Sequence, residues 1–153
     1  MTMKDKILEV SAIKDGTVID HIPADSLFKV VSILRIEKIE GMITFGTNLI
    51  SKKLGRKGII KLSGVFFKDK DINRIALIAP DAKLNIIRDY TVVEKKVVEI
   101  PDEVTGIVKC VNPQCITNHE KAPTRFYVVD KKEVKLRCHY CEKLTVKEHM
   151  TIL

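Results

Sequence analysis

The four cysteines constrain this chain more than any other feature, because all of them lie in its C-terminal third as two closely spaced pairs. Cys110 and Cys115 are separated by four residues, Cys138 and Cys141 by two, and the pairs by 22. Two short cysteine loops can place four thiolates around one ion, the tetrahedral arrangement of structural zinc sites. Because four sulfur ligands leave no position open for water, the pattern predicts a metal centre that builds structure and does not catalyse.

Other interpretations of the sulfurs remain open from the sequence. An iron centre, disulfides, or a redox dithiol formed by Cys138 and Cys141 can use the same residues. His119 and His139 are possible substitute ligands, although four cysteines already complete the set. The chain begins MTMKDKILEV and has no run of about 18 apolar residues, so we expect neither secretion nor a membrane span. We therefore expect a cytoplasmic location, where thiols bind metal more often than they form disulfides.

The composition is that of an ordinary globular protein, with 45% hydrophobic residues and a net charge of +7 over 153 residues. The positive excess is diffuse, since residues 1–100 carry 18 basic and 13 acidic side chains, and residues 101–153 carry 9 and 7. Such a field suits phosphorylated small molecules as well as nucleic acids. Aromatic residues make up only 5% and tryptophan is absent, which leaves few side chains for the base stacking typical of single-strand binders.

Residues 1–100 alternate between strand-like and helix-like segments. Extended segments are predicted over residues 6–13, 17–22, 42–50, 59–67, 83–90 and 94–100. A first helix follows Ser26, where Leu27, Phe28, Val30, Val31 and Leu34 should form the buried face. A second helix is predicted to bury Ile72, Ile75, Ala76 and Ile78, with Asp69 or Asp71 as its cap and Pro80 at its end.

The order strand, helix, strand, strand, helix, strand predicts an α+β fold. We expect a ferredoxin-like sandwich, an antiparallel sheet with two helices on one face. A change of pattern near Pro101 places the domain boundary between residues 1–100 and 101–153. The second domain is predicted to be a small all-β zinc-binding module with strands within 105–110, 124–130, 133–138 and 143–149. Its size is too small for an apolar core alone, so metal should supply much of its folding free energy.

No motif for catalysis is present. The chain lacks a nucleophile elbow, a glycine-rich phosphate loop, a dinucleotide fingerprint and HExxH, so no catalytic residue is predicted. Asp20 and His21 precede a helix, where they can contact a ribose and a phosphate or act only as a local cap. Lys57, Lys61, Lys95 and Lys96 can bind a polyphosphate if the sheet brings them together, or can form an ordinary solvated surface.

Five segments together resemble the regulatory chain of aspartate carbamoyltransferase. They are TVIDHIPA (17–24), GRKGIIKLSG (55–64), APDAKLNIIRDYTVVEK (79–95), and the cysteine segments VKCVNPQC and LRCHYCEK. The resemblance extends over essentially the whole chain. It implies a protein of pyrimidine biosynthesis without an active site, which binds CTP or ATP in residues 1–100. Residues 101–153 would hold one structural Zn²⁺ and contact catalytic trimers, which homodimers of the regulatory chain would bridge.

The resemblance also implies a role for individual residues. Ala12, Ile13 and the Tyr90 backbone would line the base, Asp20 and Lys61 the ribose and a base oxygen, and His21, Val92 and Lys95 the phosphates, with Lys57, Asn85 and Ile87 at the periphery. Cys110, Cys115, Cys138 and Cys141 would bind the metal. We expect neither a nucleic acid nor a membrane as partner. The alternative function is a zinc-ribbon nucleic-acid-binding module, which predicts binding with a steep salt dependence.

Overall fold

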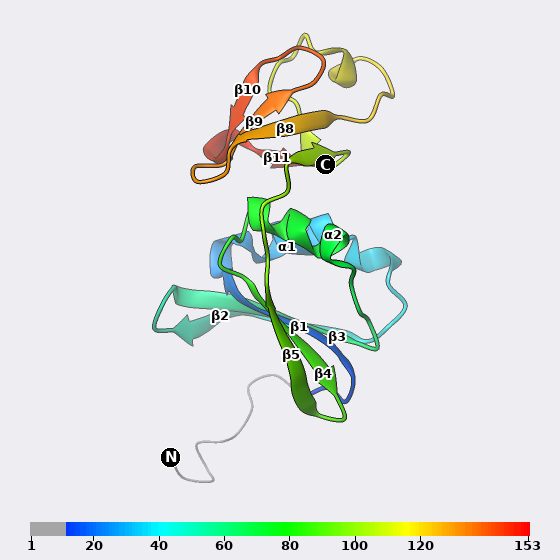
Figure 1. Cartoon of the computed structure of the whole chain (residues 1–153), viewed down its shortest axis with the longest axis vertical. Helices are drawn as coiled ribbons and strands as arrows, with labels where there is room; N and C mark the ends of the chain where they lie inside the picture. The colour runs from blue at the N-terminus through cyan, green and yellow to red at the C-terminus, as the bar shows by residue number, and fades with distance from the viewer. Residues whose placement is uncertain (1–11) are drawn as a thin grey trace.

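Alternating apolar residues build a five-stranded antiparallel sheet in the computed structural model, which describes residues 12–153. Its strands are β1 (Gly16–Pro23), β2 (Ile43–Ser51), β3 (Gly55–Ser63), β4 (Lys83–Arg88) and β5 (Thr91–Val97). Their order across the sheet is β2-β3-β1-β4-β5, so β1 is central and β2 and β5 are the edges. The first four strands in this order, with two helices on one face, form the ferredoxin-like sandwich predicted from the sequence (Figure 1).

Two short helical segments cover one face of the sheet. The turn η2 (Ala24–Ser26) leads into α1 (Leu27–Leu34), and α2 (Asp69–Ile72) continues directly into the 3₁₀ segment η4 (Asn73–Leu77). A further 3₁₀ turn, η3 (Ile36–Lys38), follows α1. The helix layer lies between the large sheet and the C-terminal domain (Figure 1). The opposite face of the sheet is not covered by any of these helices.

The buried face of α1 agrees with the prediction at Leu27 and Val30, with Val31 and Leu34 half-buried, and differs from it at Phe28 and Ile33. Leu27, Val30 and Ile33 are buried, whereas Phe28 is 63% exposed. Because α1 has only eight residues, its buried stripe is narrow, and Phe28 falls at the rim. The Phe28 ring instead packs edge to face against Phe45 of β2, with ring centroids 6.1 Å apart. The apolar face predicted for the second helix is confirmed, since Ile72, Ile75, Ala76 and Ile78 are all buried.

The predicted cap of the second helix is wrong. Lys68 occupies the N-cap position and makes no side-chain cap hydrogen bond. The two carboxylates proposed for this role have other partners: Asp69 lies 3.1 Å from Lys96, and Asp71 lies 3.3 Å from Arg74. An ion pair to a distant strand for Asp69, and one within the same helical segment for Asp71, stand in place of the capping interaction.

Strand boundaries also shift from the predicted ones. The strand expected at 59–67 begins at Gly55, where a positive φ of 78° closes a tight hairpin with β2, and ends at Ser63. Pairing with β1 and β2 on both sides therefore extends β3 into the basic segment that the sequence suggested was a turn. The extended segment predicted at 6–13 lies almost entirely outside the described residues. Among the described residues, no helix is long and apolar enough to cross a lipid bilayer.

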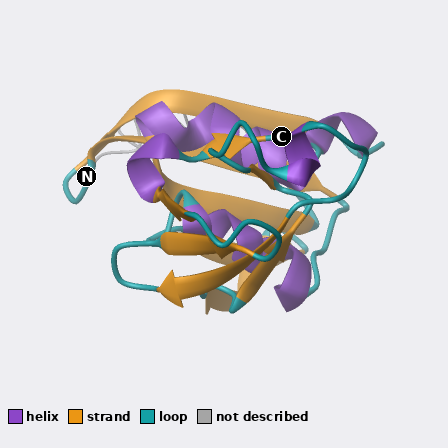
Figure 2. Cartoon of the chain, turned by 90° about the horizontal axis from the view of Figure 1, so that it is seen from above, coloured by secondary structure: helices purple, strands orange, loops and turns teal. Residues whose placement is uncertain are grey.

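The C-terminal domain is built from short strands. They are β6 (Glu103–Thr105), β7 (Val108–Lys109), β8 (Arg125–Asp130), β9 (Lys135–Cys138), β10 (Leu144–Val146) and β11 (Thr151–Ile152), with 3₁₀ turns η5 (Ile116–Asn118) and η6 (Lys147–His149). Four of the strands form a sheet in the order β10-β9-β8-β6, and β11 pairs with β7. Figure 2 gives the arrangement from above, with strands and loops making up most of this domain. The four predicted strand regions each contain an observed strand.

One hydrophobic cluster runs through both parts of the chain. In the first part its centre includes Ile19, Leu62 and Leu84, and in the second Phe126 and Leu136, each at most 2% exposed. Where the two parts meet, α1 packs near β11, and a groove there is lined by Phe28, Lys29, Ser32, Met150, Thr151 and Ile152. The C-terminal domain therefore rests on the helix layer, so a movement of the helices can reach it directly.

Candidate functional site

The four cysteines come together at one point of the C-terminal domain. The Sγ atoms of Cys110 and Cys141 are 3.6 Å apart, those of Cys115 and Cys138 are 3.7 Å apart, and all four lie within 4.8 Å of one another. A tetrahedron with metal–sulfur bonds of about 2.3 Å has sulfur–sulfur edges of about 3.8 Å. The arrangement therefore has the dimensions needed to hold one ion. The same separations are far from the roughly 2.05 Å of a disulfide.

Local hydrogen bonds shape the first cysteine loop. The Cys115 amide donates to the Asn112 carbonyl at 3.0 Å, and the Gln114 amide donates to the Asn112 side chain at 3.0 Å. The Asn118 side-chain amide then donates to the carbonyls of Cys110 and Asn112, at 3.0 and 2.8 Å. Asn118 was not predicted from the sequence, because cysteine spacing carries no information about the residue that hydrogen-bonds the end of the loop to its start.

The second loop is tighter and includes a residue with positive φ. The Glu142 amide donates to the Cys138 carbonyl at 2.9 Å, and the Cys138 amide donates to the Lys143 carbonyl at 3.0 Å. Glu142 itself has a φ of 64°. This compact turn directs the sulfurs of Cys138 and Cys141 toward the first pair.

Neither neighbouring histidine belongs to the sulfur cluster. The His119 Nε2 atom lies 2.8 Å from the Pro113 carbonyl, and the His139 Nδ1 atom lies 2.7 Å from the Tyr127 hydroxyl. Both rings are thus engaged in hydrogen bonds outside the group of four ligand atoms. Cysteine alone supplies the donor set.

A metal ion at the four cysteines must compete with protons. Burial raises the pKa of Cys110 to about 12 and also raises the pKa of Cys138. Burial acts in the same direction on Cys141, but hydrogen bonds from Asn112 and Lys143 outweigh it and lower the pKa to about 7. Four thiolates in this space require a positive ion to compensate their charge. Metal binding must therefore displace protons from at least the two cysteines with raised pKa.

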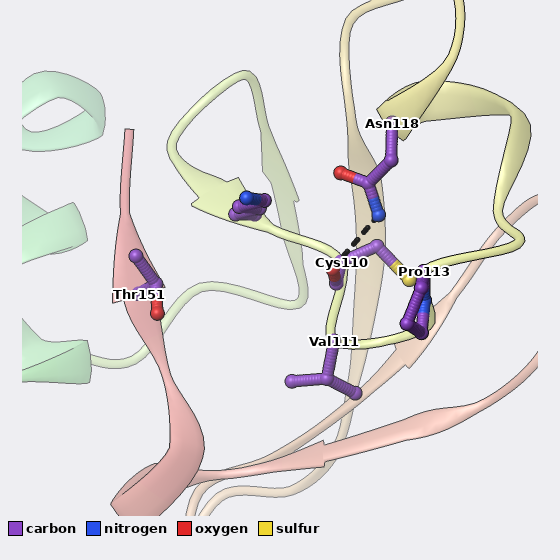
Figure 3. A pocket seen from close by; sticks show the side chains of 6 residues that line it. Cys110, Val111, Pro113, Asn118 and Thr151 are labelled. Carbon is purple, nitrogen blue, oxygen red and sulfur yellow. Dashed lines mark hydrogen bonds between the residues drawn. The ribbon is translucent and has the colours of Figure 1, made fainter.

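A shallow groove lies beside the first cysteine loop. It has a volume of about 440 Å³ and is lined by Lys109, Cys110, Val111, Pro113, Asn118 and Thr151. Figure 3 shows Asn118 donating to the Cys110 backbone at this groove, with Val111 and Thr151 below it. The metal loop thus also forms part of the surface that the domain presents outward.

The candidate effector residues of the first domain follow the register of the sheet. Lys61 pairs with Val18, Val18 with Asn85, and Asn85 with Lys95, which gives one row across four strands. Because side chains alternate along a strand and the adjacent Leu84 is buried against the helices, this row points to the uncovered face. We call this surface the open face. Three strand spacings separate the two lysines, about 14 Å.

A second group on the open face surrounds a β-bulge. The pairing of β1 with β3 is irregular between Ile19 and Ile22. The Lys57 ammonium lies 2.9 and 3.1 Å from the two carboxylate oxygens of Asp20. His21, with a φ of 59°, donates its backbone amide to Asp20 at 2.7 Å. The His21 Nδ1 atom is buried without a hydrogen-bond partner and lies 3.7 Å from the Asp20 carboxylate. A bulge at this position turns consecutive polar side chains out of the regular alternation.

Lys61 is a partly buried cation on the open face, and its pKa is shifted as a result. Burial lowers the pKa of Lys61, and the nearby Asp20 carboxylate acts in the opposite direction. An ammonium group in such a position is stabilised when an anion arrives. Lys83, which pairs with Asp20 in the register of β1 and β4, is a further cation that the sequence analysis missed. Only the pairing of the strands places it on this face.

The remaining predicted residues lie at the far end of the same strands. Ile87 pairs with Val92 and with Gly16, and the amide of Tyr90, in the turn between β4 and β5, donates to the Lys14 carbonyl at 2.9 Å. The Ile13 side chain lies next to Gly16, and Ala12 precedes it in the chain. Tyr90 is 68% exposed, so its ring is not part of the core. The structure brings Asp20, His21 and Lys57 together and aligns Lys61, Asn85 and Lys95, with the other predicted residues toward the strand ends.

Comparison with known proteins gives the same picture for both parts of the chain. Residues 8–99 match the family described as aspartate carbamoyltransferase regulatory chain, allosteric domain. Residues 102–151 match the family described as aspartate carbamoyltransferase regulatory chain, metal binding domain.

Individual relatives agree with these matches over the full length. The chain is 58% identical over 153 residues to the aspartate carbamoyltransferase regulatory chain of Bacteroides thetaiotaomicron, covering 100% of both chains. It is 53% identical over 145 residues to the protein of the same name from Pyrococcus abyssi, covering 94% of this chain and 95% of the relative. These matches favour the regulatory interpretation of the sequence over the zinc-ribbon alternative.

Proposed function

The chain belongs to the family of aspartate carbamoyltransferase regulatory chains, and from this we propose that it binds CTP or ATP and modulates catalytic chains to which it is attached. It is a regulatory chain and not a catalytic one. The observation that carries the proposal is the presence, in one chain, of a match to the allosteric domain and a match to the metal-binding domain. We assign effector binding to residues 1–100 and metal binding with catalytic-chain contact to residues 101–153.

We assign one structural Zn²⁺ to the four-sulfur cluster. Tetrahedral sulfur sites are typical of zinc and of iron, and zinc is the ion without redox chemistry, which suits a purely structural role. The domain around Cys110 and Cys138 has few strands longer than four residues, so the ion supplies a large part of its folding free energy. Elemental analysis of the purified chain tests this assignment, and one equivalent of iron in place of zinc would refute it. Free cysteines in this cluster are compatible with the reducing cytoplasm, the location that we propose.

We assign the nucleotide to the open face of the large sheet. Lys95 can bind its phosphates as a charged donor, and Lys61, at the opposite end of the same row, can donate to the ribose or to a base oxygen. An extended small molecule can lie between the two lysines. Asp20, already held by Lys57, has the acceptor oxygens that a ribose requires. Backbone groups near Ala12, Ile13 and Tyr90 are available to a base, and His21 with Val92 to the phosphates. We assign Asn85 and Ile87 to the periphery of the site.

We propose that the metal loops form the contact with the catalytic chain. Apolar side chains that protein interiors would normally bury are exposed around the two loops, at Val111, Ile116, Tyr140 and Leu144. Polar residues suited to hydrogen bonds across an interface, Asn112, Glu142 and Lys143, lie between them. Because the ion fixes both loops, it also fixes the spacing of these contact residues. Loss of the ion should therefore abolish docking.

We also propose that two regulatory chains pair through the edge of the large sheet. β2 is an edge strand, and an unpaired edge is a template for a second strand. Exposed apolar side chains gather on and beside it: Met42 is 76% exposed, Ile50 85%, and Phe28 and Phe45 contact each other there. Sedimentation of the purified chain tests the dimer, and a monomer at micromolar concentration would contradict it. Ile50→Lys should shift the equilibrium toward monomer.

The regulatory mechanism requires two states of the assembly with different contacts. A nucleotide can shift the equilibrium only by its difference in affinity for the two states. Coupling of this kind is typically about 1 to 3 kcal/mol and is reciprocal, so a ligand of the catalytic chain must change nucleotide affinity by the same factor. Between the open face and the metal loops lies the helix layer, which is the path that such coupling must cross (Figure 1).

Reconstitution with the catalytic chain of the same source tests the whole proposal. Substrate saturation curves should shift along the concentration axis when CTP or ATP is added, and the shift should vanish when the regulatory chain is omitted. A curve that is unaffected by either nucleotide in the complete assembly would refute the proposal. Titration with oligonucleotides at two ionic strengths tests the absence of a nucleic-acid partner, because tight binding that weakens steeply with salt would support the zinc-ribbon alternative.

A further inference from the structure

Consecutive lysines of strand β5 point to opposite faces of the sheet. Lys95 pairs with Asn85 and belongs to the open face, whereas Lys96 pairs with Leu84, a residue buried against the helices. Because the two residues are consecutive in the chain, a displacement of the Lys95 backbone on the open face also moves Lys96 on the helix-covered face. β5 is also an edge strand, held by β4 on one side only. Its position therefore depends on contacts other than sheet pairing.

Those contacts come from the segment formed by α2 and η4. The Lys96 ammonium lies 3.1 Å from the Asp69 carboxylate and 3.7 Å from Glu94 on its own strand. The Glu99 amide, just beyond β5, donates to the Asn73 side chain at 3.1 Å. The hydrogen bond with Asp69, followed by the charges of Asp69 and Glu94, raises the pKa of Lys96, so its ammonium group stays charged at neutral pH. Two contacts four residues apart thus attach one side of the segment to β5 and its continuation.

The adjacent side of the same segment borders the C-terminal domain. Lys70 and Arg74, each one position after a residue that contacts β5, line a groove together with Pro101, Glu103, Val104, Thr105 and Ile107. On the other side of the segment, Asp69 and Asn73 line a separate groove with Glu94, Lys96, Val97 and Glu99. Residues four apart share one side of a helical segment, so each groove contains one such pair. Figure 1 shows the chain leaving β5 and passing the helix layer on its way to the C-terminal domain.

We propose that the segment α2–η4 transmits effector binding at the open face to the C-terminal domain. In this proposal Lys96, Asp69 and Asn73 act as positioning residues for strand β5. The inference rests on the proposed function, because it takes Lys95 on the open face as an effector contact. Binding of an anion at Lys95 shifts β5. The Asp69–Lys96 pair and the hydrogen bond from Glu99 to Asn73 carry that shift to the segment, and the adjacent pair, Lys70 and Arg74, carries it to β6.

The two contacts are suited to positioning and contribute little to stability. The Asp69 side chain is 72% exposed and that of Lys96 33%, and exposed ion pairs add little to the free energy of folding. A variant that lacks them should therefore fold and bind the effector. In that variant, effector binding should no longer change the C-terminal domain. A purely structural role of the three residues would not predict this selective loss.

The experiment is hydrogen exchange on the full zinc-loaded chain with and without saturating CTP. In the wild type, CTP should change exchange in β3 and β4, and should also change exchange of the β6 and β7 amides by about fivefold or more, the low end of typical coupling. In the double variant Lys96→Gln with Asn73→Ala, the effect at β3 and β4 should persist, while the effect at β6 and β7 should fall below about twofold.

Two single variants serve as controls. Glu94→Gln removes a charge near Lys96 without breaking a contact to the helical segment and should retain the response at β6 and β7. Lys96→Arg keeps a cation within reach of Asp69 and should retain it as well.

Three results would overturn the inference. They are a wild-type chain that binds CTP without any response at β6 and β7, a double variant with an undiminished response, and an equal loss in the Glu94→Gln control. If CTP binds neither the wild type nor the variants, the proposed function itself fails, and the inference fails with it.

Discussion

Removal of the Lys95 ammonium group is the most direct test of the proposal that the nucleotide binds at the open face. Lys95 is exposed on an edge strand, and it makes no ion pair with any other residue in the part of the chain that the structure describes. Lys95→Ala therefore leaves no carboxylate without its partner, and surface changes of this type alter stability by roughly 0.5 kcal/mol or less. Any change in nucleotide affinity can then be assigned to the lost contact.

The expected size of the effect follows from the position of the side chain. A hydrogen bond to a charged group contributes about 1.5 to 3 kcal/mol, and solvent exposure at Lys95 favours the lower part of that range. A loss of about 1.5 to 2 kcal/mol weakens CTP binding by roughly 10 to 30 times, since 1.4 kcal/mol is tenfold in Kd. The loss should diminish at high salt, because an exposed charge is screened.

The assay is isothermal titration calorimetry with CTP on the wild type, on Lys95→Ala and on a matched control. Lys52, exposed in the turn between β2 and β3, carries the same charge away from the row formed by Lys61, Asn85 and Lys95. Lys52→Ala should leave the Kd within about twofold of the wild type. An unchanged Kd for Lys95→Ala, or an equal weakening in Lys52→Ala, would show that the effector does not bind where we place it.

Three further outcomes are expected. Cys138→Ser should release the metal and unfold residues 101–153 while the large sheet stays folded, because structural zinc sites supply on the order of 10 kcal/mol; circular dichroism and metal analysis check this, and a variant that retains one equivalent of metal would contradict it. Zinc affinity should rise from pH 6 to pH 8, because binding displaces protons from thiols such as Cys110, whose pKa of about 12 lies above that window; a competitive chelator titration measures it, and a flat profile would count against thiolate ligation. Phe126→Ala, at a position with 0% exposure, should destabilise the C-terminal domain by about 3 to 5 kcal/mol in denaturant unfolding, whereas the exposed Val129→Ala should change little.

Some features of the metal centre could be predicted because their causes are local. Cys110 with Cys115, and Cys138 with Cys141, are each close enough in sequence for one turn to present both sulfurs to an ion. The residues that shape these turns could not be predicted in the same way. Asn118 reaches back eight residues to the Cys110 carbonyl, and many side chains can make such a contact.

The second helix illustrates the limit of local rules. Its apolar period correctly predicted that Ile75 and Ala76 would be buried. Its cap was predicted wrongly, because Asp69 pairs with Lys96 of a strand 27 positions further along the chain. A carboxylate near a helix start can satisfy either partner, and local sequence does not show which of them lies closer in space.

The open face shows most clearly which features local sequence predicts and which depend on the tertiary structure. Residue chemistry alone indicated that Asp20, Lys57, Lys61 and Lys95 are able to bind a phosphorylated ligand, and the periodic burial pattern indicated a sheet with helices on one side. Whether those side chains share a face depended on long-range register, since a slip of one residue would turn a whole strand over. Pairing of Val18 with both Lys61 and Asn85 set that register. Composition and spacing thus established which chemistry is possible, and the packing of distant strands established where it is gathered.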